Sequence, residues 1–96
     1  MNYQKRKMTE QIKEETLLKF VKALYIVSTY YTIDGFQVDD YQGLLFIWCE
    51  ITDTYLSIIK NLINKLKENG LKVDDIEFVE EDGKTYMQII VKLKDD

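Results

Sequence analysis

Apolar residues recur at helical spacing in the N-terminal third of the chain. Thr9 is a suitable N-cap residue, and Asp34-Gly35 is a suitable stop because glycine readily takes a left-handed conformation. The pattern therefore predicts a first helix over residues 9–33. The residues that follow the three-four spacing of one helix face are Leu17, Val21, Leu24, Ser28 and Tyr31.

A second helical pattern covers residues 41–69. Asp39 and Gln42 have the spacing of a capping box before it, and Gly70 follows its end. Residues 52–54 interrupt it with Thr-Asp-Thr, which is poor in helix interiors, so the sequence allows one long helix or two helices broken there. Residues 36–38 between the two patterns suit a short strand or an extended connector. In the pattern over residues 41–69, the residues at three-four spacing on one helix face are Leu45, Trp48, Thr52, Tyr55, Ile59, Leu62 and Leu66.

The C-terminal part alternates between apolar and polar residues around Asp82-Gly83, a strong two-residue hairpin turn. Pairing outward from this turn places Phe78 opposite Met87 on one face. Further out, strict pairing would bring Asp74 onto that face, and one extra residue at Asp74-Asp75 restores the apolar order. We therefore predict an antiparallel hairpin over residues 71–93 with a β-bulge at that point.

These patterns together predict a single α+β domain over residues 1–96, with N-terminal helices followed by the hairpin. Two strands alone are marginal in water, so the hairpin needs residues 36–38 or a second copy of the chain to extend its sheet. The six-residue apolar run 44–49 is also wider than one contact face requires. Both features favour a homodimer.

The amino-acid composition excludes most kinds of catalytic site. The 96 residues contain no histidine, no proline and one cysteine, which excludes histidine-based acid–base pairs, intrachain disulfides and Cys/His zinc sites. Cys49 lies within the apolar run and is predicted to be a buried reduced thiol. The carboxylate clusters are typical of caps, turns and exposed edges. We expect a non-enzymatic protein with no catalytic residues, no metal and no cofactor.

The chain is acidic overall, with a net charge of −4, but basic and acidic blocks alternate along it. Residues 1–22 carry six basic and three acidic side chains, and residues 60–72 carry four lysines and one glutamate. Residues 34–54 carry five acids without a base, and residues 74–96 carry eight acids. The longest apolar run is far shorter than the ~20 residues of a membrane span, and no apolar stretch follows the basic N-terminus. A cytoplasmic protein without membrane contact is expected.

The sequence from Ile59 to Leu71 resembles the end of a recognition helix and its entry into the wing of winged helix-turn-helix domains. Over residues 36–93, the resemblance implies a positioning helix at 41–51, a turn at 52–54 and a wing at 71–93. It implies a DNA-binding regulator that dimerises through the first helix. The polar face of the recognition helix would consist of Ser57, Lys60, Asn61, Asn64, Lys65 and Lys67, with a phosphate-contacting arm of Lys5, Arg6 and Lys7.

A second interpretation is an acidic homodimeric interaction module that binds a basic protein partner through the hairpin. A break at residues 52–54 favours the DNA interpretation, whereas one straight helix over 41–69 favours a helical-hairpin module. The hairpin residues in question are Glu77, Glu80, Glu81 and Asp82. In either case, antiparallel packing of the two long helices would bring together Tyr25, Tyr30, Tyr31, Tyr41, Trp48 and Tyr55.

Overall fold

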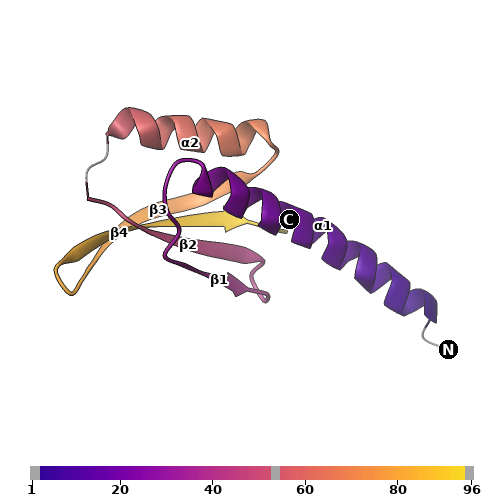
Figure 1. The fold of residues 1–96 in the computed structure, drawn as a ribbon. Helices are drawn as coiled ribbons and strands as arrows, with labels where there is room; N and C mark the ends of the chain where they lie inside the picture. The colour runs from indigo at the N-terminus through magenta and orange to yellow at the C-terminus, as the bar shows by residue number, and fades with distance from the viewer. Residues whose placement is uncertain (1–2, 53–54, 95–96) are drawn as a thin grey trace.

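The computed structural model describes residues 3–52 and 55–94, and within these ranges it describes side chains from residue 14 onward. The chain is α+β, with two helices and one four-stranded antiparallel sheet (Figure 1). The sheet order is β1-β2-β4-β3, so two hairpins lie side by side. The elements are α1 (Tyr3–Ser28), β1 (Gly35–Asp39), β2 (Leu44–Glu50), α2 (Leu56–Glu68), β3 (Lys72–Glu81) and β4 (Lys84–Lys92).

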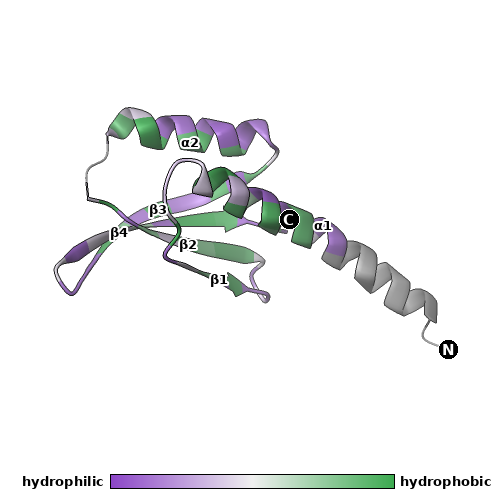
Figure 2. Cartoon of the chain, viewed as in Figure 1, coloured by the Kyte–Doolittle hydropathy of each residue, from purple (hydrophilic) through white to green (hydrophobic). Residues whose placement is uncertain are grey.

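Both helices pack against the same face of the sheet, and the core lies between them and the two central strands. On β2 every second residue is buried, as expected for a strand with one covered face, and on β4 the buried Met87, Ile89 and Val91 lie on the same face. Figure 2 shows the hydrophobic colour on these central strands, whereas β3 is largely hydrophilic. The fully buried side chains with the largest volumes are Leu45, Ile47, Leu62, Leu66, Met87 and Ile89.

The first helix begins and ends earlier than predicted. It runs from Tyr3 to Ser28, so Thr9 lies within it and is not its cap. Its end is marked by two hydroxyl groups, because Ser28 donates to the carbonyl of Tyr25 and Thr29 donates to that of Ile26, each at 2.6 Å. Such bonds satisfy backbone oxygens that lack helical partners, and the chain then turns toward the sheet.

The prediction of helix over residues 41–51 is wrong, because residues 44–50 form strand β2. Thr52 is a bend, residues 53–54 lie outside the described residues, and α2 begins only at Leu56. The predicted positioning helix therefore does not exist. The error has a physical reason: a strand in the middle of a sheet has apolar residues on both faces, and such a short continuous run has no periodicity that separates strand from helix.

The capping interaction predicted at Asp39 occurs in a turn instead of a helix. Its Oδ1 accepts a hydrogen bond from the backbone N–H of Gln42 at 3.1 Å, and its carbonyl accepts from Gly43 at 2.8 Å. The same side-chain chemistry serves helix starts and tight turns. Here it closes the β1–β2 hairpin.

The C-terminal hairpin is confirmed in detail. Asp82 and Gly83 have φ values of 54° and 77°, as in a two-residue hairpin turn of type I′. Phe78 pairs with Met87 as predicted, and the register shifts between Val73 and Asp75, where the bulge was predicted. Residues 36–38 lie within the short strand β1, and the first hairpin supplies the additional strands that the second one needed.

Candidate functional site

The face of the sheet opposite the helices carries apolar side chains without a covering element from the described part of the chain. We call this surface the open face. It consists mainly of Leu44, Phe46 and Trp48 on β2, Tyr86, Gln88 and Ile90 on β4, and Glu77, Val79 and Glu81 on β3. Ile90 is 8% exposed and yet lies outside the main core cluster, because its strand neighbours on this face shield it.

A row of residues crosses the middle of the open face. Trp48 pairs with Gln88, which in turn pairs with Glu77. The indole Nε1–H of Trp48 donates to Oε1 of Gln88 at 2.5 Å, and Nε2 of Gln88 donates to Oε2 of Glu77 at 3.3 Å. Gly35 lies opposite Trp48 on the other side, where a Cβ would stand 3.4 Å from the ring. The side chains of the row are therefore held in place across three strands.

Two open hollows lie on either side of this row, and Trp48 and Gln88 line both of them. The first, of about 300 Å³, also has Asp34, Glu81 and Tyr86 in its walls. The second, of about 510 Å³, is bordered by Gln37, Asp39, Asp40 and Phe46. Neither lining contains a basic residue. Each hollow therefore combines an aromatic floor with negatively charged borders.

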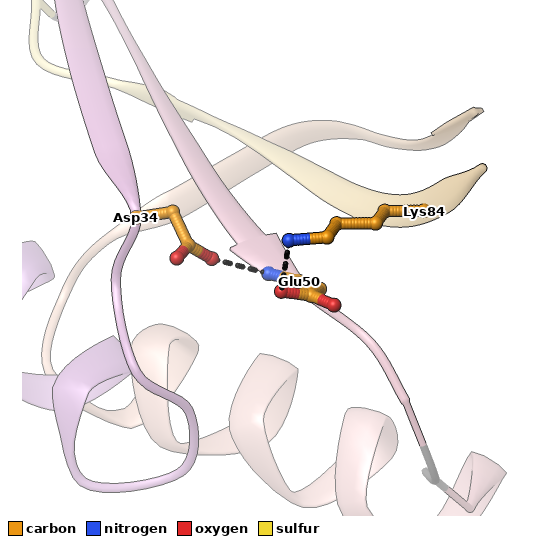
Figure 3. A network of polar contacts seen from close by, with 3 residues as sticks. All are labelled: Asp34, Glu50 and Lys84. Atoms are coloured by element: carbon orange, nitrogen blue, oxygen red, sulfur yellow. Dashed lines mark hydrogen bonds and ion pairs between the residues drawn. The ribbon is translucent and has the colours of Figure 1, made fainter. Parts of the chain in front are cut away.

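A small polar network fixes the end of β2 next to the first hollow (Figure 3). Oδ2 of Asp34 accepts a hydrogen bond from the backbone N–H of Glu50 at 2.6 Å, and the N–H of Asp34 donates to the carbonyl of Trp48 at 2.8 Å. Lys84 lies 3.9 Å from the carboxylate of Glu50 and is largely exposed. At that distance and exposure the pair contributes little stability, whereas the two backbone bonds determine where Asp34 stands.

Cys49 lies on the covered face of β2 and is fully buried. Burial, with a smaller contribution from the negative charge of Asp34, raises the pKa of its thiol from 9.0 to about 11. A thiol with this pKa stays protonated near neutral pH and is a poor nucleophile. Among the described residues, no group of three or more side chains could hold a metal ion.

The structure separates the acidic residues that the sequence analysis grouped in the hairpin. Glu77 and Glu81 project from the open face, because they are four residues apart on one strand. Glu80 belongs to the opposite face, and Asp82 occupies the turn. Two of the four predicted protein-binding residues therefore lie on the open face, and of these only Glu81 lines a hollow, whereas Glu77 contacts Gln88.

The predicted DNA-binding residues of α2 do share a surface. All six are exposed on its outer side, away from the buried Ile59, Leu62 and Leu66. Lys5, Arg6 and Lys7 belong to the N-terminal half of α1, which projects beyond the sheet, and their side chains lie outside the described residues. The structure thus places the basic blocks in the helical layer and much of the acidic charge in the sheet.

The predicted cluster of aromatic residues between two helices does not form. Tyr25, Tyr41 and Tyr55 are all more than 60% exposed, and Trp48 lies on the open face of the sheet. The row from Trp48 to Glu77 was not predicted, since Trp48 was placed in a helix. One signal pointed to it: the second face of the C-terminal hairpin carries Val79, Tyr86 and Ile90 among charged residues.

Comparison with known proteins finds no matching family model, no matching curated protein and no matching solved structure. In the described part of the chain, no helix is long and apolar enough to cross a membrane.

Proposed function

We propose that this chain is a non-enzymatic interaction module whose open face binds a basic, partly apolar segment of another protein. The observation that supports it is the lining of the two hollows. Phe46, Trp48 and Tyr86 form an aromatic floor, carboxylates border it, and no basic residue belongs to either lining. Aromatic side chains supply contact area at low entropic cost, and acidic borders select partners of opposite charge.

The charge of the hollows favours a basic polypeptide over nucleic acid as the ligand of the open face. Exposed aromatic residues on an open antiparallel sheet are also a platform on which RNA bases stack. Here, however, Asp34, Asp39, Asp40 and Glu81 border the hollows, and their carboxylates would repel a phosphate backbone. A lysine- or arginine-containing polypeptide gains from the same charges.

Trp48 is the only tryptophan, so its fluorescence reports directly on the centre of the open face. We would titrate the protein with a synthetic amphipathic peptide of leucine and lysine, and with a peptide in which glutamate replaces lysine. The proposal predicts that the lysine peptide shifts the emission of Trp48 and that the glutamate peptide does not. Equal responses to both peptides, or none, would contradict it.

A matched pair of variants separates the site from general attraction to an acidic protein. Glu77→Lys with Glu81→Lys changes the open face, whereas Glu80→Lys with Glu68→Lys makes the same change of net charge elsewhere. We expect the first pair to weaken binding of the lysine peptide by about tenfold more than the second. Equal weakening would mean that net charge alone attracts the peptide.

A second candidate function is contact with DNA through the outer side of α2, as the winged-helix resemblance implied. The exposed Lys60, Lys65 and Lys67 support it, together with the basic N-terminal half of α1. Because β2 precedes α2 in place of a positioning helix, this proposal concerns phosphate contacts instead of a helix-turn-helix motif.

Fluorescence anisotropy of a labelled random duplex at low and near-physiological salt tests this candidate. Micromolar binding that weakens steeply with salt is expected, and Lys60→Glu with Lys65→Glu should remove it. Lys72→Glu with Lys84→Glu, two exposed lysines of the sheet, is the control with equal net charge. Binding that both variants lose equally, or no binding at low salt, would reject α2 as a DNA-contacting surface.

A further inference from the structure

Helix α1 has apolar side chains on two opposite sides. Ala23 and Val27 are fully buried against the core. Val21 and Tyr25, each two residues from Ala23 and therefore about 200° around the axis, are 53% and 69% exposed. Leu17 and Leu18 extend the outer apolar side by another turn, with exposures of 57% and 66%.

This outer side is unusual for a helix that packs on a single domain. A surface helix normally has one apolar stripe toward the core and polar residues opposite it. Here the outer stripe is continuous over two turns, and α1 also projects beyond the sheet (Figure 1). Contiguous exposed apolar side chains on such a helix mark an interaction surface.

We propose that the outer side of α1 is the interface with a second copy of this chain, with the two α1 helices antiparallel. In a twofold dimer, residue i contacts residue j of the partner and residue j contacts residue i. If Leu18 packs against Val21 of the other copy, the two residue numbers add to 39, and the same sum brings Tyr25 beside Glu14. Leu18 and Val21 then form two equivalent central layers.

The residues that flank this seam are complementary in the same register. Flanking residues meet when their numbers add to two more or two less than the central sum. On one side, Leu17 therefore meets Leu24 of the other copy (sum 41), which adds two apolar contacts. On the other side, Glu15 meets Lys22 (sum 37), and symmetry produces this ion pair twice. Flanking positions of paired helices commonly determine orientation through such pairs. Lys22 lies at the edge of the seam, where its Nζ is 3.4 Å from the carbonyl oxygen of Asn69.

The pairing of Glu15 with Lys22 favours a second copy of this chain as the partner. Within one helix, Glu15 and Lys22 are seven residues or about 10 Å apart, too far for contact with each other. A parallel pair of helices would not bring Glu15 near Lys22 of the other copy. The interface lies on the side of α1 away from the sheet, so it leaves the open face free.

Charge exchange tests both the partner and the orientation. We would measure dimerisation by sedimentation velocity over a concentration series for the full chain and for Glu15→Lys, Lys22→Glu and the double variant. Each single change places like charges together twice in the dimer, and we expect it to weaken dimerisation by about tenfold. The double variant restores opposite charges and should recover the original dissociation constant.

A second variant probes the apolar seam. Val21→Glu should leave a monomer, whereas Leu56→Glu, at an exposed apolar residue of α2, should leave dimerisation unchanged. Circular dichroism checks that both variants keep the fold. A monomeric wild-type chain, a dimer that survives Val21→Glu, or a double charge variant as weak as the single ones would overturn the proposal. Peptide binding by monomeric Val21→Glu tests the open face separately.

Discussion

The indole nitrogen of Trp48 donates a hydrogen bond to Gln88 across the two central strands, on the face of the sheet opposite the helices. The ring is therefore held against the sheet at the boundary between two hollows. An aromatic side chain fixed before binding loses little conformational entropy when a partner covers it. This geometry makes Trp48 both the centre of the proposed binding surface and its natural reporter.

Replacing Gln88 tests how far this bond holds the ring. Gln88→Met removes the acceptor but keeps the length of the side chain, and we expect it to lower the free energy of unfolding by about 1 kcal/mol. The indole N–H resonance of Trp48 should move toward its position in water. Gln37→Met, a neighbouring polar change on β1, serves as the control. An unchanged indole resonance in Gln88→Met would show that the bond does not position Trp48.

The buried thiol of Cys49 predicts a loss of stability in alkaline solution. Its pKa is 9.0 in an exposed thiol and about 11 in the fold. Between these values the unfolded chain releases a proton that the folded chain retains, so the free energy of unfolding falls as pH rises from 9 to 11, by about 2 kcal/mol. Below pH 9 this contribution is fully present.

Cys49→Val isolates this contribution because every other titratable group is the same in the two proteins. Urea unfolding at pH values from 8 to 11 should show a shallower decline for the valine variant. A thiol reagent should modify native Cys49 slowly at pH 8 and rapidly in urea. Parallel pH profiles for the two proteins would contradict the assigned shift.

Gly43 is predicted to be the least replaceable glycine of the turns. Its φ is +68°, and a Cβ there would lie 2.6 Å from Cγ of Lys94. The backbone cannot move away easily, since the carbonyl of Gly43 accepts a bond from Leu93 at 2.7 Å. We expect Gly43→Ala to cost about 2 kcal/mol, and Gly70→Ala, with φ +77° and open space, about 1 kcal/mol. Equal losses in thermal unfolding would refute the steric argument.

The parts of the fold that were predicted correctly depend on local signals. The Asp82-Gly83 turn determines its own backbone conformation, and the alternation on either side of it determines the register, including the extra residue at Asp74. In contrast, β2 lies inside the sheet only because it also pairs with β4, which is far away in sequence. Its side chains are apolar on both faces because one face meets the helices and the other forms the open face.

The candidate site could be predicted only as far as its strand assignments were correct. The alternation of β3 and β4 already placed Tyr86 and Ile90 together, whereas Trp48 joins them only through the long-range pairing of β2 with β4. The outer stripe of α1 was part of a predicted helix, but the sequence alone could not show which of its apolar residues the core would bury. That division depends on where the sheet lies.

The bulge between β3 and β4 offers the sharpest test of the register. Val73 pairs with Val91 and Asp75 pairs with Ile90, so Asp74 is the unpaired extra residue. Deleting Asp74 leaves both pairs in place, and we expect the fold to persist with a change of less than about 1 kcal/mol. Deleting Asp74 and Asp75 together moves Val73 opposite Ile90 and turns it from the core to the open face.

That one-residue slip should cost about 2–3 kcal/mol, since Lys72 then faces the core in place of Val73. Urea unfolding measures both deletions, and amide spectra show whether the resonances of β4 keep their positions. Both deletions remove acidic residues from an exposed strand. We nevertheless expect the deletion of Asp74 alone to lower stability less, because it keeps the pairing register of β3 with β4. Equal damage from the two deletions would mean that Asp74 contributes more than a spacer to the sheet.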